Sequence, residues 1–310
     1  MEKTPTYTGY GHGKLLLTGE YAVLDGAKAL AVPTRLGQRF TALGTADRGL
    51  RWTALDHFGG SWFDARFSSL ASSTGDPVGQ RILQLLRAAD DLRAGCTAPL
   101  FAGTAVRTQL EFDRAWGLGS SSTLVHCLAE YLRVDPYQLL DATFGGSGYD
   151  IACAGAAGAV VYVRNTGDPE PDVRPAPHWP PPWARDTFFI YRNRKQNSRE
   201  GIRRYRKQVA GKDQELLRQV SALTERLLSQ PLPLRTAAQI LRQHERVIGG
   251  AIATEPVQES LFPDFRGAVK SLGAWGGDFM WALPEPGVDT VAYFNARGYR
   301  VVIPYDEMVL

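Results

Sequence analysis

The stretch "DRAWGLGSSSTLVHCLAEYL", residues 113–132, places two glycines and three serines directly before an apolar helical pattern. Glycine and serine favour a loop, because glycine loses much backbone entropy in a helix and serine competes for backbone hydrogen bonds. Beyond the serines, Leu124, Leu128 and Leu132 recur at the spacing of one helix face. A Gly-rich loop that opens a helix presents free N–H groups at the positive end of the helix dipole. The stretch therefore predicts a phosphate site or, alternatively, an ordinary serine-capped helix.

The composition is that of a globular protein. The chain has 310 residues, of which 44% are hydrophobic and 22% charged, and its net charge of +3 gives no indication of a nucleic-acid partner. Its longest weakly polar stretch, 151–163, is too short to span a bilayer, and residues 1–10 lack the apolar core of a signal peptide. Cys96, Cys127 and Cys153 are widely spaced and odd in number, which is typical of reduced thiols. We expect a cytoplasmic protein without a membrane or nucleic-acid partner.

Periodicity along the chain predicts an α+β protein. The expected strands cover residues 13–24, 29–43, 158–164, 187–192, 278–283 and 298–305, the first two joined by a turn at Gly26. The expected helices cover residues 80–93, the segment from the serines to Arg133, a segment capped by Asp135, and residues 198–229 and 235–253.

Residues 165–186 contain seven prolines, which exclude a helix or a central strand. Such a segment is typical of a connection between domains or, alternatively, of a Pro-rich ligand for another protein. We take it as a connection. The sequence then predicts an N-terminal domain over 1–165, a proline-rich connection over 166–186 and a C-terminal domain over 187–310.

Four further stretches carry residues suited to phosphate chemistry. They are "GHGKLLLTGEYAVL" (11–24), "GGSGYDIACAGAAG" (145–158), "RKQNSREG" (194–201) and "LGAWGGDFMWA" (272–282). With the serine loop, they form three motifs in order: a G-K…G-E-x-x-V pattern, G-L-G-S-S and G-A-x-G-G. One such motif would be weak evidence, but three in order over nearly the whole chain are specific. The sequence resembles the GHMP small-molecule kinases, which include galactokinase, homoserine kinase, mevalonate kinase and phosphomevalonate kinase.

Details of the motifs resemble the bacterial phosphomevalonate kinases most. Tyr21 stands where mevalonate kinases carry a histidine, Trp116 directly precedes the serine loop, and Asp278 follows the glycines of the third motif. Two residues depart from the family pattern. His12 replaces a proline before Gly-Lys, and Trp275 replaces a glycine, which puts a bulky ring in a loop that normally lies against the substrate.

The resemblance implies a two-lobed α+β fold, with an N-terminal lobe of the ribosomal-protein type and a C-terminal ferredoxin-like lobe. ATP and the acceptor would bind between the lobes. The implied activity is transfer of the γ-phosphoryl group of ATP to phosphomevalonate, in the mevalonate pathway of isoprenoid precursors. Mevalonate is the alternative acceptor, and a non-catalytic metabolite sensor is the alternative of a different class. The implied partners are ATP, Mg²⁺ and a small anionic acceptor, with the protein as a monomer or homodimer.

The resemblance also implies roles for individual residues. Lys14 and Asp150 are the implied catalytic pair, in which Lys14 holds phosphoryl charge while Asp150 orients or deprotonates the acceptor. Lysine is scarce in this chain, with seven lysines against twenty-eight arginines, and Lys14 stands in an apolar strand. We therefore do not expect Lys14 to be an ordinary surface lysine. Read alone, Lys14 could be a strand-end lysine and Asp150 a helix cap.

The implied ATP-binding residues are Gly117, Leu118, Gly119, Ser120, Ser121 and Ser122. The implied substrate-binding residues are Glu20, Tyr21, Gly148, Ser198, Gly276, Gly277 and Asp278. Ser121 is the expected magnesium ligand. A second ligand stays open: Glu130 lies roughly 13 Å further along the helix, which leaves Asp141 as a candidate.

Overall fold

The computed structural model describes residues 5–165, 167, 170–194, 198–209, 213–275 and 277–310. Within them the chain forms two compact units that interleave along the sequence. Unit 1 comprises residues 1–13, 36–114 and 118–155, and unit 2 comprises residues 14–35, 115–117 and 156–310. The expected division into domains 1–165 and 187–310 stays a prediction.

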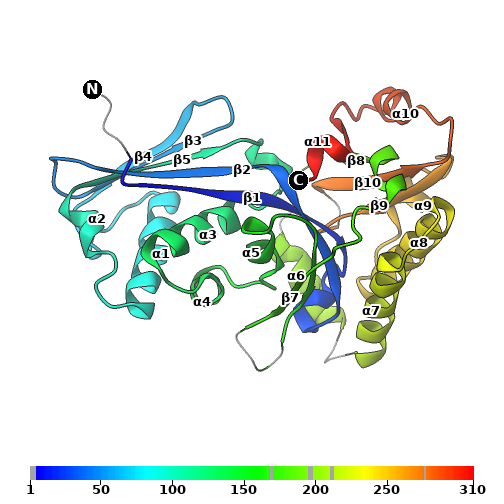
Figure 1. Cartoon of the computed structure of the whole chain (residues 1–310), viewed down its shortest axis with the longest axis horizontal. Helices are drawn as coiled ribbons and strands as arrows, with labels where there is room; N and C mark the ends of the chain where they lie inside the picture. The colour runs from blue at the N-terminus through cyan, green and yellow to red at the C-terminus, as the bar shows by residue number, and fades with distance from the viewer. Residues whose placement is uncertain (1–4, 166, 168–169, 195–197, 210–212, 276) are drawn as a thin grey trace. The chain divides into compact units, whose positions relative to one another are not determined.

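Unit 1 is an antiparallel and parallel sheet covered by helices on one face (Figure 1). Two strands, β1 (Tyr7–Thr18) and β2 (Ala29–Gly44), continue from this unit into unit 2. The other elements are β3 (Leu50–Leu55), β4 (Ser61–Phe67), α1 (Pro77–Leu92), α2 (Ala98–Gly103), β5 (Thr104–Leu110), α3 (Ser120–Leu132), α4 (Pro136–Thr143) and α5 (Tyr149–Ala154). The strand order here is β4-β3-β5-β2, with β1 on β2, and β3 runs parallel to β5.

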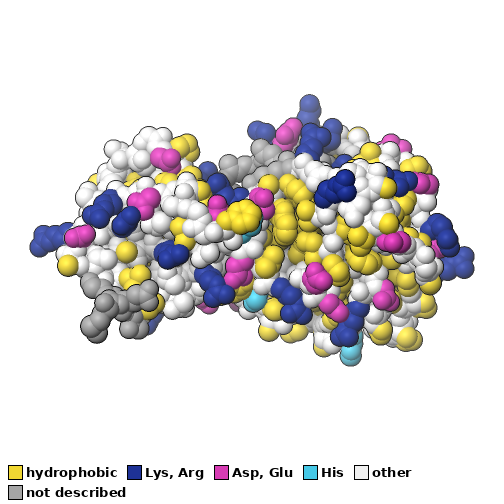
Figure 2. All heavy atoms as spheres, turned by 90° about the horizontal axis from the view of Figure 1, so that it is seen from above, with side chains coloured by type: hydrophobic (Ala, Val, Ile, Leu, Met, Phe, Trp, Pro, Cys, Tyr) yellow, Lys and Arg dark blue, Asp and Glu magenta, His cyan; other side chains and the backbone are white. Residues whose placement is uncertain are grey.

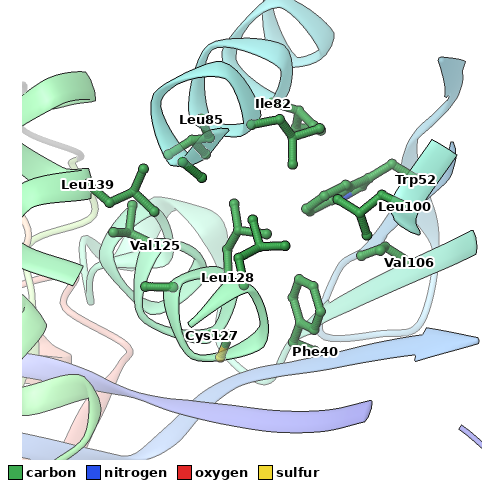
Figure 3. Packing of buried hydrophobic residues seen from close by; sticks show 14 of the residues in the cluster. Phe40, Trp52, Ile82, Leu85, Leu100, Val106, Val125, Cys127, Leu128 and Leu139 are labelled. Carbon is green, nitrogen blue, oxygen red and sulfur yellow. The ribbon is translucent and has the colours of Figure 1, made fainter. Parts of the chain in front are cut away.

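The core of unit 1 lies between the sheet and helices α1, α3 and α4. Figure 3 shows Phe40, Trp52 and Val106 of the strands facing apolar side chains of these helices. The helical side consists of residues at helix spacing, such as Ile82, Leu85, Val125, Leu128 and Leu139. This packing fixes the direction of α3, the helix that the serine loop opens.

Unit 2 contains the remaining elements. Its strands are β6 (Val160–Val163), β7 (Asp172–Pro175), β8 (Phe188–Tyr191), β9 (Gly267–Ser271), β10 (Phe279–Pro284) and β11 (Val302–Pro304). Its α-helices are α6 (Ser198–Gln208), α7 (Gln214–Leu228), α8 (Leu234–Ala251), α9 (Val257–Leu261), α10 (Thr290–Ala296) and α11 (Tyr305–Met308). The 3₁₀ turns are η1 (Ala22–Asp25) and η3 (Pro182–Asp186) here, and η2 (Arg114–Trp116), which begins in unit 1.

The C-terminal sheet of unit 2 has the order β11-β8-β10-β9, with antiparallel neighbours throughout. Helices lie between β8 and β9 in the sequence and again between β10 and β11. This βαββαβ succession and strand order form the ferredoxin-like arrangement that the resemblance to the GHMP kinases implies. Helix α8 packs on both α7 and β9. The α+β fold class is confirmed.

One expectation about local structure is corrected. Residues 13–24 are not one strand, because β1 ends at Thr18 and the backbone turns through Gly19 (φ +94°) and Tyr21 (φ +58°) into η1. The described residues of the proline-rich segment contribute the edge strand β7 and the 3₁₀ turn η3, in which the ring of Trp183 is buried. The role of this segment as a connection between domains stays a prediction.

Candidate functional site

The serine loop opens α3 as the sequence predicts. Gly117 (φ +68°) and Gly119 (φ +92°) both adopt the left-handed conformation that favours glycine. The first helical bond runs from the Thr123 N–H to the Gly119 carbonyl, 3.0 Å. The N–H groups of the three serines therefore lie in the first turn, where a helix offers no carbonyl partner. Together with the helix dipole, this turn favours an anion.

The three serines of this turn differ in their hydroxyl groups. Ser122 is buried and its Oγ donates to the Gly119 carbonyl, 2.9 Å, so it can serve a ligand only through its backbone. The Ser121 side chain is exposed, and Ser120 is half-buried. Leu118 is buried and anchors the loop to the protein interior. Of the three serines, Ser121 is the most exposed, so its hydroxyl is the most open to a phosphate or a metal ion.

Lys14 lies beside the first residue of the loop. Its Nζ donates to the Gly117 carbonyl, 3.0 Å. The carboxylate of Asp278 also lies against Gly117, so close that a Cβ at this position would collide with it. Two backbone bonds hold Asp278, one from the Arg192 N–H to its carbonyl and one from its N–H to the Arg194 carbonyl, both 2.8 Å. Unit 2 thus brings a cation and a carboxylate, both expected from the sequence, to Gly117.

Tyr21 lies within a packed cluster of unit 2. Its ring stacks on Tyr205 with 5.7 Å between centroids, and Gly201 leaves the room that its hydroxyl needs. Burial raises the pKa of Tyr21 to about 12, and Tyr205 donates to the Asp25 carboxylate, 2.8 Å. The substrate-binding role of Tyr21 stays a prediction, since its side chain is 7% exposed.

Glu20 is fully buried and forms an ion pair with Lys270 of β9. Burial raises the pKa of Glu20, while the ammonium of Lys270 opposes that rise. The expected contact of Glu20 with the substrate stays a prediction, and the complete burial of its side chain argues against that contact. The sequence motifs do not include Lys270. The scarcity of lysine that singles out Lys14 in an apolar strand applies equally to Lys270, which stands in "FRGAVKSL".

Asp150 and Gly148 belong to unit 1. Gly148 (φ +89°) precedes α5, and Asp150 lies in the first turn of that helix, half-buried, with its Oδ1 accepting the Ile151 N–H, 3.1 Å. Helix α5 packs on α3, where Gly155 lies against the ring of His126. The expected catalytic acid is therefore on a helix packed against the one that the serine loop opens.

The remaining expected residues belong to unit 2. Trp275 does not project from its turn, because its ring is 5% exposed and packs in a cluster with Tyr21, Tyr205 and Ile248. Gly277 is buried. Gly276 and the side chain of Ser198 lie outside the described residues, so their roles stay predictions.

The described residues contain no cluster of three or more His, Cys, Asp or Glu that could hold a metal ion. That is compatible with magnesium, which keeps several waters and is commonly bound through one or two side chains and the substrate phosphates. The exposed Ser121 hydroxyl suits such a site. Glu130 is engaged elsewhere: it accepts from the Tyr7 hydroxyl, 3.2 Å, and lies 3.6 Å from His126 Nε2.

The surface carries charges of both signs. Figure 2 shows basic and acidic side chains interspersed over the visible face. Within the described part of the chain, every helix is too short or too polar to cross a bilayer.

Comparisons with known proteins place the fold. No family model matches the sequence, and no curated protein is significantly similar to it. Solved structures do match. Streptococcus pneumoniae phosphomevalonate kinase, solved with phosphomevalonate and AMPPNP, has 16% sequence identity and a TM-score of 0.68, over 94% of this chain and 95% of that chain.

Two other solved structures match nearly end to end. L. major mevalonate kinase, solved with R-mevalonate, has 14% identity and a TM-score of 0.63, over 98% of each chain. Lactococcus lactis galactokinase, solved with galactose, has 14% identity and a TM-score of 0.64, over 97% of this chain and 94% of that chain. The chain therefore has the α+β fold of the GHMP small-molecule kinases.

Proposed function

We propose that this protein is an ATP-dependent kinase that transfers the γ-phosphoryl group of ATP to phosphomevalonate. Its motif details support this acceptor, and so does the similarity in fold to a phosphomevalonate kinase. The observation that carries the proposal is the position of Lys14, whose Nζ is held 3.0 Å from the carbonyl of the first loop residue, Gly117. A cytoplasmic location and a monomer or homodimer stay predictions.

In this proposal, the first turn of α3 binds the phosphates of ATP. The backbone N–H groups of Ser120, Ser121 and Ser122 have no carbonyl partner within the helix and would donate to the phosphate oxygens. The exposed Ser121 hydroxyl is the ligand offered to Mg²⁺. When bound, the metal ion neutralises charge on the β- and γ-phosphates.

Lys14 and Asp150 then act on the reacting groups. Phosphoryl transfer depends on positioning and charge stabilisation, because the charge of the transferred group spreads over its oxygens. Lys14 supplies a compact positive charge for that group and for the anionic acceptor. The phosphate of phosphomevalonate is already an anionic nucleophile at neutral pH, so Asp150 orients the acceptor rather than removing a proton.

Release of ADP with a panel of acceptors tests the proposal. The panel comprises phosphomevalonate, mevalonate, homoserine and galactose, each with ATP and Mg²⁺, and the Lys14→Met variant prepared identically controls for contaminating kinases. We expect the highest kcat/KM with phosphomevalonate. A higher kcat/KM with mevalonate would identify a mevalonate kinase instead. ATP binding without ADP release on any acceptor would favour a metabolite sensor.

A further inference from the structure

A buried ion pair joins the two segments of unit 2 that carry the residues around Gly117. The Glu20 side chain is fully buried and pairs with Lys270, whose side chain is 1% exposed and also donates to the Ser271 carbonyl, 2.8 Å. Glu20 follows β1, the strand of Lys14. Lys270 is the penultimate residue of β9, and the turn after β9 ends at Asp278.

Helix α8 holds the same two segments through consecutive side chains. His244 Nε2 accepts the Gly19 N–H, 3.0 Å, and Glu245 Oε2 accepts the Ser271 N–H, 2.9 Å. His244 is also 3.6 Å from Glu20. Burial holds the pKa of His244 well below its ordinary value, and Lys270 lowers it further, so the ring is neutral and its Nε2 is free to accept. The segments are thus held to each other and to one helix.

Each of the two segments contains a residue whose backbone conformation requires support from its surroundings. Tyr21 directly follows Glu20 with φ +58°, and Asp278 ends the other segment with φ +53°. A residue other than glycine adopts this left-handed conformation only when its surroundings impose it. The same two segments carry the side chains at Gly117. Lys14 Nζ donates to the Gly117 carbonyl, and the Asp278 carboxylate lies against the same glycine.

We propose that Lys270 is a positioning residue: its buried ion pair with Glu20 sets the places of Lys14 and Asp278 beside Gly117. The expected change in kcat rests on the proposed kinase function. The expected change in the positions of Lys14 and Asp278 does not depend on it. Lys270 does not touch the substrate. It acts through Glu20 on the strand of Lys14 and through the β9–β10 turn on Asp278.

The informative variant replaces both partners, Glu20→Gln with Lys270→Met. Removing one charge alone would leave the other buried without a partner and could unfold the protein, whereas replacing both partners leaves neither charge of the pair buried. The matched control is Lys28→Met with Glu225→Gln, which removes an ion pair of the same residue types at the surface of unit 2.

In steady-state assays, we expect the double variant of the buried pair to keep a Tm close to that of the wild type and to lose about ten-fold or more in kcat, as misplaced reacting groups do. The acceptor KM should change less than about three-fold, and the control should keep its wild-type kcat. An unchanged kcat would overturn the proposal. So would an acceptor KM that rises while kcat is kept, because Glu20 would then contact the acceptor directly.

Crystal structures of the wild type and the two double variants test the geometry without turnover. We expect the 3.0 Å bond from Lys14 to Gly117 in the wild type and the control, and its loss in the variant of the buried pair. Retention of this bond in that variant would overturn the proposal. A wild-type protein that phosphorylates no acceptor would contradict the proposed function, and the crystal structures would still decide the role of Lys270.

Discussion

The indole ring of Trp275 packs against Gly249 of α8, where a Cβ would lie 3.3 Å from the ring. The same Cβ would lie 2.6 Å from the Thr254 carbonyl, so a glycine is required here first by the turn after α8 and only secondarily by the ring. Since the ring is buried in the cluster of Tyr21 and Tyr205, it fills the interior of unit 2 rather than the space outside its turn. The Trp275 ring of the third motif therefore packs against α8, a helix outside that motif.

The Trp275→Ala variant should lose stability rather than change its acceptor. Truncating a buried tryptophan leaves a cavity and costs about 3–5 kcal/mol. Urea unfolding followed by circular dichroism measures that loss, and Phe58→Ala, at an 86% exposed position, is the control that should stay within about 0.5 kcal/mol of the wild type. A Trp275→Ala protein as stable as the wild type but with a new acceptor preference would place the ring at the substrate.

The Gly119→Val variant should lose ATP binding. Gly119 has φ +92° and precedes the first turn of α3, so a β-branched residue there would distort the N–H groups that we assign to the phosphates. The apparent KM for ATP should rise at least ten-fold, or turnover should vanish. Gly95→Val controls for backbone strain, because Gly95 (φ +77°) has open space around it. If both variants fold and have the same apparent KM for ATP, the serine loop is not part of the ATP site.

The pattern of apolar residues and glycines predicted α3, its first residues and the strands β8, β10 and β11, because helix and strand periodicity are local properties. It did not predict β9 or the packing of distant segments. The ion pair of Glu20 with Lys270 joins residues 250 positions apart, and no local pattern reveals such a pair. The same holds for Trp275 and Gly249, whose contact only the fold shows.

Glu245 should make stability fall as the pH rises. Burial raises its pKa from 4.5 to about 7, so between these values the folded state holds a proton that the unfolded state has released. Its stabilising contribution is fully present below pH 4.5 and is lost as the pH rises through 7, up to about 3 kcal/mol in all. Glu20, whose pKa is also raised, acts in the same direction.

His244 opposes this trend in the same pH range. Its pKa in the folded state is well below 6.5, so protonation of the unfolded chain lowers stability as the pH falls below 6.5. The Glu245→Gln variant lacks the contribution of Glu245 and keeps that of His244. Its free energy of unfolding should therefore rise more steeply with pH between 5 and 7 than that of the wild type. Denaturant titrations at closely spaced pH values measure both slopes. Parallel curves for the two proteins would show that Glu245 does not titrate in this range.

The division of work between Lys14 and Asp150 is the sharpest test of the acceptor. With phosphomevalonate, Lys14 must hold two phosphates against their repulsion, while Asp150 only orients the acceptor. Lys14→Met should then cost about 3–4 kcal/mol in kcat/KM, and Asp150→Asn about 1–2 kcal/mol. Lys207→Met, at an exposed position of α6, should match the wild type.

An alcohol acceptor such as mevalonate reverses this order. The carboxylate of Asp150 must then take up a proton in the transition state, and the amide of Asp150→Asn cannot, so this variant should lose at least as much as Lys14→Met. Both variants are therefore assayed on phosphomevalonate and on mevalonate, with kcat and KM determined separately. If phosphomevalonate is the preferred acceptor and Asp150→Asn is nevertheless the more damaged variant, Asp150 is a base, and the roles assigned to the two residues are wrong.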